Sequence, residues 1–163
     1  MMETFFTSDT HFGHKSVIDF CKRPYFYVEE MDEALVENWN SVVGPEDRVY
    51  HLGDFAWTMK AAKRIRPRLN GNIRLIIGNH DDVPKLSATG MFTRMNLWRQ
   101  FPEWNFTATH IPLAVTETRT GSFNVHGHKH NDPSFIPEPH QINVCVENTA
   151  YKPIHVDEIL ALI

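Results

Sequence analysis

The stretch Ile73–Asp81, which reads IRLIIGNHD, decides how the rest of the chain is interpreted. Its first five residues are almost all apolar, which is typical of a central strand covered on both faces. A glycine follows, and then come Asn79, His80 and Asp81, which carry an amide, an imidazole and a carboxylate. The stretch therefore predicts a strand that delivers metal-capable side chains to a loop at its C-terminal end.

The same arrangement recurs at other short strand candidates along the chain. These are Thr4–Ser8 before Asp9 and His11, Arg48–Leu52 before Asp54, Phe106–Thr109 before His110, and Phe123–Val125 before His128 and His130. In open α/β sheets the ligand crevice lies beyond the carboxyl ends of the strands. We therefore expect these side chains to converge into one cluster, although they are distant in sequence.

Helical patterns separate the strands of the first half, and this alternation predicts an α/β fold. The expected helices are Glu29–Val43, Met59–Leu69 and, at the end of the chain, Val156–Ile163. The second half has further short strand candidates at Leu97–Phe101 and Ile142–Val146, which suggests a more meandering sheet. No linker or repeat interrupts the pattern, so we expect one domain over residues 1–163.

The charge balance argues against tight binding of long duplex nucleic acid. The net charge is −4 at pH 7, so the chain has no basic excess that could neutralise a run of phosphates. One local exception is a basic cluster at helical spacing, which is more typical of a solvated face than of a binding patch. It consists of Lys60, Lys63, Arg64, Arg66 and Arg68.

The two cysteines and the hydropathy pattern bear on the compartment. Cys21 and Cys145 are far apart and form no paired motif, so a reducing environment fits. The start of the chain has no signal-peptide pattern, and no window approaches 18 apolar residues. We expect a soluble, cytoplasmic protein without a membrane partner.

The residue types at the strand ends indicate which metals would bind. Mixed oxygen and nitrogen ligands suit a transition metal such as manganese, iron, zinc or nickel. They suit magnesium and calcium less well, because these ions favour shells of oxygen ligands. The cluster also has too many ligands for one ion. A carboxylate from the middle of the sheet can bridge two ions about 3.5–4 Å apart, the spacing used for in-line attack at phosphorus. Asp54 is the natural candidate for this bridge.

The order of these blocks resembles the signature of the calcineurin-like metallophosphoesterases, and the resemblance covers most of the chain. The matching blocks are Asp9-x-His11, Gly53-Asp54, Gly78-Asn79-His80-Asp81, His110 and Gly127-His128-x-His130. Five blocks in the right order are far more specific than any one of them alone. The opening Asp9–His14, continued through Phe20–Pro24, is similar to a branch of small bacterial and phage members.

The resemblance implies a fold, a ligand set and a reaction. The fold would be a two-sheet α-β-β-α sandwich with the metal site at the C-terminal ends of the strands. One ion would be held by Asp9, His11 and His130. The other would be held by Asn79, His110 and His128, with Asp54 shared between the two. A metal-activated hydroxide would attack the phosphorus, and His80 would stabilise the phosphate or protonate the leaving oxygen.

One position departs from the family pattern. Relatives often carry, three residues after the aspartate of Gly-Asp, a second aspartate that orients the catalytic histidine, whereas this chain has Trp57. His80 therefore lacks its usual partner. Asp81 or Asp82 could replace that partner.

Several other residues near the blocks receive no metal in this interpretation. They are His14, His51, His126 and His140. Arg23 and Lys15 could reach a substrate phosphate, but a solvated loop is slightly favoured for both. The tryptophans could stack on a base, although core packing is the more common role. They are Trp39, Trp57, Trp98 and Trp104.

The function expected from all this is hydrolysis of a phosphodiester in a small, nucleotide-like or broadly variable phosphate ester. Phosphomonoesterase or protein phosphatase activity is the alternative within the same chemistry. A non-catalytic metal-binding scaffold is the rival from another class, and its usual mark is a missing ligand or a missing catalytic histidine. All seven ligand positions and His80 are present here. A nuclease acting on long DNA is disfavoured by the charge balance.

Overall fold

The first sheet contains three of the strands that precede predicted site residues. The computed structural model describes residues 2–114, 117 and 121–163 of the chain. The strand order is β4-β3-β2-β1-β9, in which β9 is antiparallel to β1 and the other neighbours are parallel. The strands are β1 (Thr4–Thr7), β2 (Arg48–His51), β3 (Asn72–Ile76), β4 (Arg94–Asn96) and β9 (Ile154–His155). The C-terminal ends of β1, β2 and β3 therefore lie at one edge.

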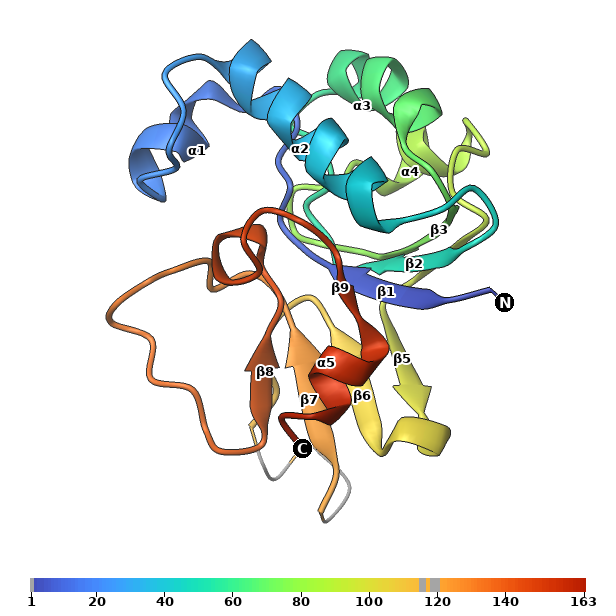
Figure 1. Cartoon of the computed structure of the whole chain (residues 1–163), viewed down its shortest axis with the longest axis vertical. Helices are drawn as coiled ribbons and strands as arrows, with labels where there is room; N and C mark the ends of the chain where they lie inside the picture. The colour runs from blue at the N-terminus through green and yellow to red at the C-terminus, as the bar shows by residue number, and fades with distance from the viewer. Residues whose placement is uncertain (1, 115–116, 118–120) are drawn as a thin grey trace.

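The second sheet is built from the second half of the chain. Its order is β5-β6-β7-β8, with β5 antiparallel to β6 and the remaining neighbours parallel. The strands are β5 (Trp98–Phe101), β6 (Phe106–Thr109), β7 (Phe123–His126) and β8 (Gln141–Asn143). Figure 1 shows this sheet beneath the first one. The predicted two-sheet α/β fold is confirmed.

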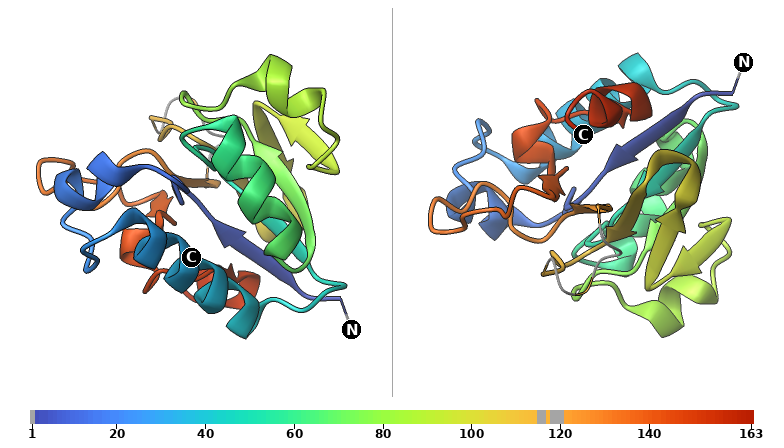
Figure 2. Two further views of the ribbon diagram at one scale, coloured as in Figure 1. Left: turned by 90° about the horizontal axis from the view of Figure 1, so that it is seen from above. Right: turned by 90° about the horizontal axis from the view of Figure 1, so that it is seen from below.

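Helices α1 to α4 lie on the side of the first sheet that faces away from the second (Figure 1). The helices are α1 (Lys15–Phe20), α2 (Val28–Val42), α3 (Met59–Ile65), α4 (Val83–Ser87) and α5 (Val156–Leu160), with 3-10 turns η1 (Arg66–Arg68), η2 (Pro102–Trp104) and η4 (Val146–Asn148). Figure 2 shows α2 and α3 crossing over the first sheet from above. None of the helices in the described residues has both the length and the apolar content of a membrane span.

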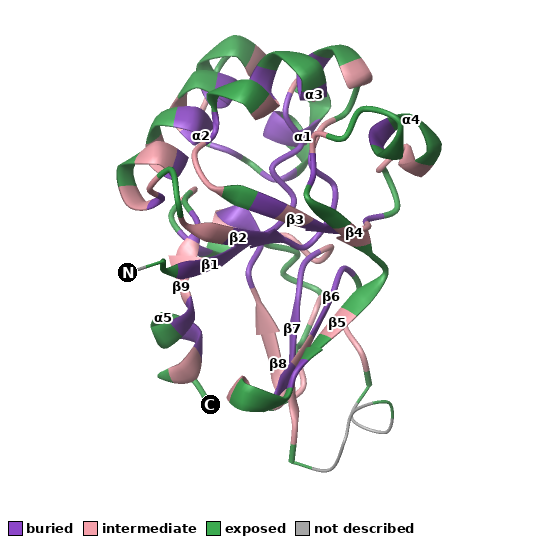
Figure 3. Cartoon of the chain, turned by 90° about the vertical axis from the view of Figure 1, so that its right-hand side faces the viewer, coloured by how far each residue is buried: buried purple, intermediate pink, exposed green. Residues whose placement is uncertain are grey.

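Two apolar layers hold these elements together, because successive side chains of a strand point to opposite faces. Phe5 packs into the layer between the helices and the first sheet, with Leu35, Trp39 and Ile65. Its neighbour Phe6 packs into the layer between the two sheets. Other members of that second layer are Tyr50, Ile76, Phe101, Phe106 and Val125, together with Val156 and Ile159 of α5. Figure 3 shows the buried strands at the centre of the molecule.

The predicted elements differ from the observed ones mainly at their ends. The helix expected over Met59–Leu69 stops as an α-helix at Ile65 and continues as η1, because Pro67 lacks the N–H that an α-helix requires. The strand expected over Ile142–Val146 covers only Gln141–Asn143, since Val146 begins η4. The short elements α1, α4, β4 and β9 were not predicted.

The basic cluster on α3 and η1 is largely engaged within the fold. Arg64 forms an ion pair with Asp32, and Arg68 donates to Glu33 at 2.7 Å. The guanidinium of Arg66 donates to the Met91 carbonyl at 2.9 Å. These three arginines are therefore held by other segments of the chain.

Candidate metal centre

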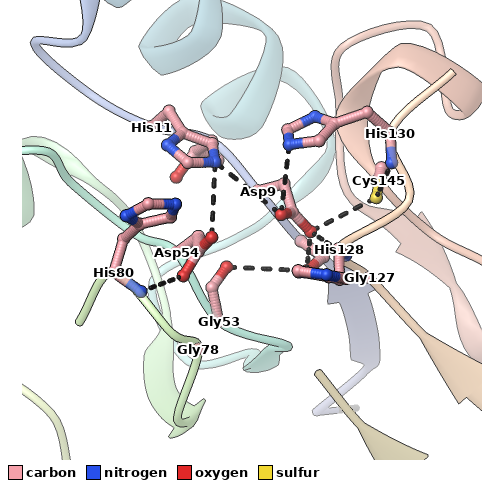
Figure 4. A network of polar contacts seen from close by, with 12 residues as sticks. Asp9, His11, Gly53, Asp54, Gly78, His80, Gly127, His128, His130 and Cys145 are labelled. Carbon is pink, nitrogen blue, oxygen red and sulfur yellow. Dashed lines mark hydrogen bonds and ion pairs between the residues drawn. The ribbon is translucent and has the colours of Figure 1, made fainter. Parts of the chain in front are cut away.

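The strand ends of both sheets meet at one place. Asp9 and Asp54 follow β1 and β2, Asn79 follows β3, His110 follows β6, and His128 follows β7. Figure 4 shows Asp9, Asp54, His11 and His130 turned toward a common centre. The structure thus brings together all of the residues that the sequence predicted as ligands.

The first half of the cluster surrounds the Asp9 carboxylate. Its Oδ1 atom lies 3.7 Å from Nε2 of His11 and 3.5 Å from Nε2 of His130. Nε2 of His11 also lies 3.5 Å from Oδ2 of Asp54. Asp9 Oδ1 and His11 Nε2 are buried and have no hydrogen-bond partner, which is rare for buried polar atoms. Donor atoms about 2.0–2.2 Å from one ion would stand at such separations, so these residues fit a metal.

The second half of the cluster lies on the other side of Asp54. Nε2 of His110 is 3.5 Å from Oδ2 of Asp54 and 2.9 Å from Oδ1 of Asn79. Nδ1 of His128 lies 3.2 Å from the same His110 nitrogen. The Oδ2 atom of Asp54 is therefore equally distant from an imidazole of each half.

Two thiols also lie close to this centre. Among the described residues, three groups have donor atoms close enough to hold an ion: Asp9, His11 and Asp54; Asp9, His130 and Cys145; and Cys21, His130 and Glu147. The thiol of Cys145 donates to Asp9 Oδ2 at 3.2 Å. Burial raises the pKa of this thiol, and the nearby carboxylates of Asp9 and Glu147 raise it further. Cys145 is thus a neutral donor to Asp9.

The Asp9 carboxylate is held as an anion by its surroundings. Burial alone would raise the pKa of Asp9, but close imidazoles, first that of His11 and then those of His130 and His110, outweigh it and hold the pKa well below its ordinary value. The backbone N–H of His128 and the hydroxyl of Ser8 donate to Oδ2. Oδ2 therefore accepts hydrogen bonds from the protein, while Oδ1 faces the centre of the cluster.

The backbone at the ligands adopts an unusual conformation. Asp9, His11, Asp54, His128 and His130 all have positive φ angles, between 43° and 68°. This left-handed region is uncommon for residues other than glycine and costs of order 1 kcal/mol or more each. Such residues concentrate at functional sites, because the surrounding structure must hold them there.

Two of the motif glycines are explained by close approach to the carboxylates. A Cβ atom at Gly78 would lie 2.2 Å from Oδ1 of Asp54, and one at Gly127 would lie 2.3 Å from Oδ2 of Asp9. Any side chain at either position would displace a carboxylate. The glycines that precede Asn79 and His128 are therefore part of the construction of the site.

A buried ion pair between Arg23 and Glu147 contacts His130 on the side of the ring that faces away from Asp9. Nδ1 of His130 lies 3.0 Å from Oε1 of Glu147, and Arg23 Nη2 donates to the same oxygen at 2.7 Å. Arg23 also donates to the carbonyl oxygens of Asp9 and Thr10, at 2.7 and 2.9 Å. The expectation that Arg23 lies in a solvated loop is wrong, since its side chain is 0% exposed. Its buried charge is balanced by Glu147, which the sequence did not single out.

The groups around His130 favour its protonated form in the metal-free protein. Burial would lower the pKa of His130, but contacts with Cys21 and Glu147 and the charge of Asp9 raise it to about 10. The backbone carbonyl of His130 accepts hydrogen bonds from Asn143 and Asn148, at 2.9 and 2.8 Å. Side chain and backbone of His130 are both anchored.

His80 lies at the exposed rim of the cluster. Its backbone N–H donates to Asp54 Oδ1 at 2.9 Å, and its ring centroid lies 5.6 Å from that of His11 (Figure 4). The expected replacement partners are engaged elsewhere: Asp81 accepts backbone N–H groups of the neighbouring loops, including that of Asp54 at 2.9 Å, and Asp82 caps α4. The idea that one of them orients His80 is therefore not supported.

Trp57 fills the space beside His80 instead. The two ring centroids are 5.2 Å apart, and Trp57 stacks on His14 at 3.8 Å. Nδ1 of His14 in turn lies 3.3 Å from Nδ1 of His11. Burial, followed by the nearby charge of His11, lowers the pKa of His14 to about 4. His14 and Trp57 thus form an uncharged aromatic wall next to the cluster.

The remaining histidines have partners outside the cluster. Nε2 of His51 lies 2.9 Å from the Thr10 hydroxyl, and Nε2 of His140 lies 3.1 Å from the Leu113 carbonyl. Nδ1 of His126 lies 2.8 Å from the Gly127 carbonyl. Each of these three rings thus has a polar partner that is not a side chain of a predicted ligand.

The tryptophans divide into two kinds. Trp39 is buried in the core, and Trp104 packs against the layer between the sheets. Trp57 and Trp98 are 46% and 57% exposed. The expectation of core packing is thus correct for the first two and wrong for the other two.

Comparison with known proteins identifies the class to which this fold and cluster belong. The model of the family described as calcineurin-like phosphoesterase matches residues 2–160. The chain therefore belongs to the calcineurin-like phosphoesterase family.

The similar proteins span archaea, phages and bacteria. An uncharacterized protein of Methanocaldococcus jannaschii is 36% identical over the whole chain and 92% of its own length. The Gene 66 protein of Mycobacterium phage L5 is 42% identical over 50% of this chain and 41% of its own length. A crystal structure of a protein of unknown function from Aquifex aeolicus has a TM-score of 0.76, at 26% identity and 100% coverage of both chains.

Proposed function

We propose that the chain is a phosphodiesterase that works with two divalent transition-metal ions, of which manganese suits the donors best. The observation that carries the proposal is the position of Asp54, whose Oδ2 lies 3.5 Å from Nε2 of both His11 and His110. A carboxylate placed between two groups of donors is what a pair of ions about 3.5–4 Å apart requires. Mixed carboxylate, amide and imidazole donors favour manganese, iron, zinc or nickel over calcium.

In this proposal the ligands divide as the two halves of the cluster do. Asp9, His11 and His130 hold one ion, Asn79, His110 and His128 hold the other, and Asp54 is shared. When bound, the ions would polarise the phosphoryl group and activate water as the nucleophile. Asp9 stays anionic, and the anchoring of His130 keeps its Nε2 directed at the centre.

His80 acts on the substrate in this proposal. Its backbone is tied to Asp54 and its ring lies at the exposed rim, next to the site of the phosphoryl group. From there an imidazole N–H can donate to a phosphoryl oxygen or transfer its proton to the leaving oxygen. Trp57 limits the movement of the ring and takes the place that an orienting aspartate has in relatives.

The space on both sides of the cluster supports a diester over a monoester. A cavity of about 610 Å³ adjoins His128 and His130, and another of about 570 Å³ adjoins Asn79 and His110. Both ester arms of a diester could therefore extend away from one phosphate. Arg23, one of the two residues considered for contact with a substrate phosphate, is held by Glu147 inside the protein.

The substrate and the compartment are part of the same proposal. The arginines of the basic cluster are committed to intramolecular contacts, which supports a small phosphate ester over a long duplex. Cys21 and Cys145 are free and buried, which fits a cytoplasmic setting.

The test uses metal-stripped protein and a pair of chromogenic esters, p-nitrophenyl phosphate and bis(p-nitrophenyl) phosphate. Manganese, nickel, zinc and magnesium are added back one at a time, with Asp54→Ala as the inactive control. We expect the diester to be cleaved faster, with manganese most effective. Faster cleavage of the monoester would favour a phosphomonoesterase, and two bound ions without turnover of either ester would favour a non-catalytic scaffold.

A further inference from the structure

A cavity beside the candidate metal centre has the character of a binding site for an aromatic ring. The cavity, of about 570 Å³, begins at Asn79 and His110 and extends along the outer face of β5 and β6. A group attached to a phosphate at the centre could therefore enter it directly. This inference rests on the proposed function, because it assigns a substrate group to that same site.

Strand alternation explains which side chains form the floor of the cavity. Trp98 and Gln100 of β5 stand opposite Thr109 and Thr107 of β6, and all of them line the cavity. Their neighbour Phe101 points to the other face, into the layer between the sheets. The floor is thus a fixed sheet surface that offers one indole, one amide and the Thr107 hydroxyl, while the Thr109 hydroxyl is engaged with Ile111 and Asn124.

The wall of the cavity carries large apolar side chains that remain exposed. Leu97, Trp98 and Ile111 are 72%, 57% and 54% exposed, and all of them line the cavity. Exposed apolar groups gathered around a concavity with a few polar groups are typical of small-molecule sites. Figure 3 shows β5 at the edge of the second sheet.

The charges on the two sides of the metal centre differ. The cavity next to His128 and His130 is lined by Lys22 and Lys129 and by one carboxylate, that of Asp132. The cavity next to Asn79 has no lysine or arginine among its described lining residues, and it includes the carboxylate of Glu117. Among the described residues the charge on this side is thus that of one carboxylate, which suits an uncharged ring better than a second phosphate.

We propose that this cavity binds the nucleobase of a nucleotide ester, with Trp98 as the stacking surface. The indole ring would cover one face of the base, while Gln100 supplies both a donor and an acceptor for its edge. Because stacking tolerates any base, the site selects aromatic ester groups over small aliphatic ones. Trp98 is a specificity residue and takes no part in the chemistry.

The test compares ligands that share a phosphate and differ in the attached group. Thymidine 5′-monophosphate and methyl phosphate are titrated calorimetrically into manganese-loaded wild type, Trp98→Ala and Trp98→Phe. Trp98→Ala should weaken thymidine monophosphate binding at least about fivefold and leave methyl phosphate unchanged. Trp98→Phe should keep most of the preference. Phe26→Ala, which removes an aromatic side chain that is 88% exposed and lies outside the cavity, is the matched control.

Three results would overturn the inference. They are no preference for the nucleotide in wild type, equal losses for both ligands in Trp98→Ala, and a change from dimer to monomer in that variant without any loss of nucleotide binding. The last result would show that the apolar face joins two copies of the chain. Hydrolysis of methyl p-nitrophenyl phosphate by the wild type, measured alongside, tests the proposed activity separately, because it reports turnover at the metal centre whatever the two binding titrations show.

Discussion

Replacing Glu147 with glutamine should weaken metal binding at the site that includes His130. The carboxylate lies 3.0 Å from Nδ1 of His130 and is 1% exposed, so it orients the imidazole and increases the basicity of Nε2. Glutamine keeps the size and one carbonyl acceptor but removes the charge. Outer partners of metal-binding histidines are typically worth about 10–100-fold in metal affinity. We expect Glu147→Gln to lose about that much.

The same change should also lower the stability of the metal-free protein. Arg23 would keep its hydrogen bonds to the Asp9 and Thr10 carbonyls but would lose its counter-charge in a fully buried position. Removing one partner of a buried pair costs about 3–5 kcal/mol, and the retained carbonyl contacts place this case near the lower end. Urea unfolding in the presence of a chelator measures this loss.

A surface pair in the same chain provides the matched control. Glu33 and Arg68 also form an ion pair, but their side chains are 51% and 39% exposed. Exposed pairs contribute about 0–1 kcal/mol, so Glu33→Gln should change neither quantity much. Metal affinity is measured by chelator competition at a temperature where every variant is folded. If Glu147→Gln is destabilised but binds metal with wild-type affinity, Glu147 stabilises the fold and does not contribute to metal binding.

Three further predictions concern the centre itself. Asp54→Ala should lose both ions, because neither group of ligands is complete without the shared carboxylate, and metal analysis that finds two tightly bound ions would exclude the bridge. His80→Ala should keep its metal content and lose at least about a hundredfold in kcat. The loss should be smaller for a nitrophenyl ester if His80 mainly donates a proton, and full activity on every ester would refute the role. Because the pKa of metal-free His130 is raised to about 10 and a ligand must be neutral, affinity for the ion at His130 should rise about tenfold per pH unit near neutrality. A flat pH profile would contradict that proton release.

The sequence was sufficient to predict the parts of the site that are local. Most of the predicted ligands directly follow a short strand or lie next to a motif glycine, so the pattern that predicts the strand also predicts where these side chains lie. Ile73–Asp81 is the best example, since β3 ends at Ile76 and Asn79 reaches His110. Convergence then follows from the parallel arrangement of β1, β2 and β3.

The support of His130 could not be predicted in the same way. Arg23 and Glu147 are 124 positions apart, and neither lies in a periodic pattern that shows a buried face. A buried arginine also contradicts the general tendency of charged residues to be exposed. Asn143, whose side chain donates to the His130 carbonyl, was predicted only as part of a strand.

Several features that break the ordinary rules of protein structure coincide at Asp9 and His11. Asp9 combines a positive φ angle, complete burial and an oxygen without a hydrogen-bond partner, and His11 next to it repeats the combination with a ring nitrogen. A stable fold tolerates such local conflicts mainly where function requires them. Their chemistry also agrees, since an anionic oxygen and an imidazole nitrogen 3.7 Å apart lack only a cation between them. The strain and the unpartnered atoms therefore support the metal assignment independently of the family resemblance.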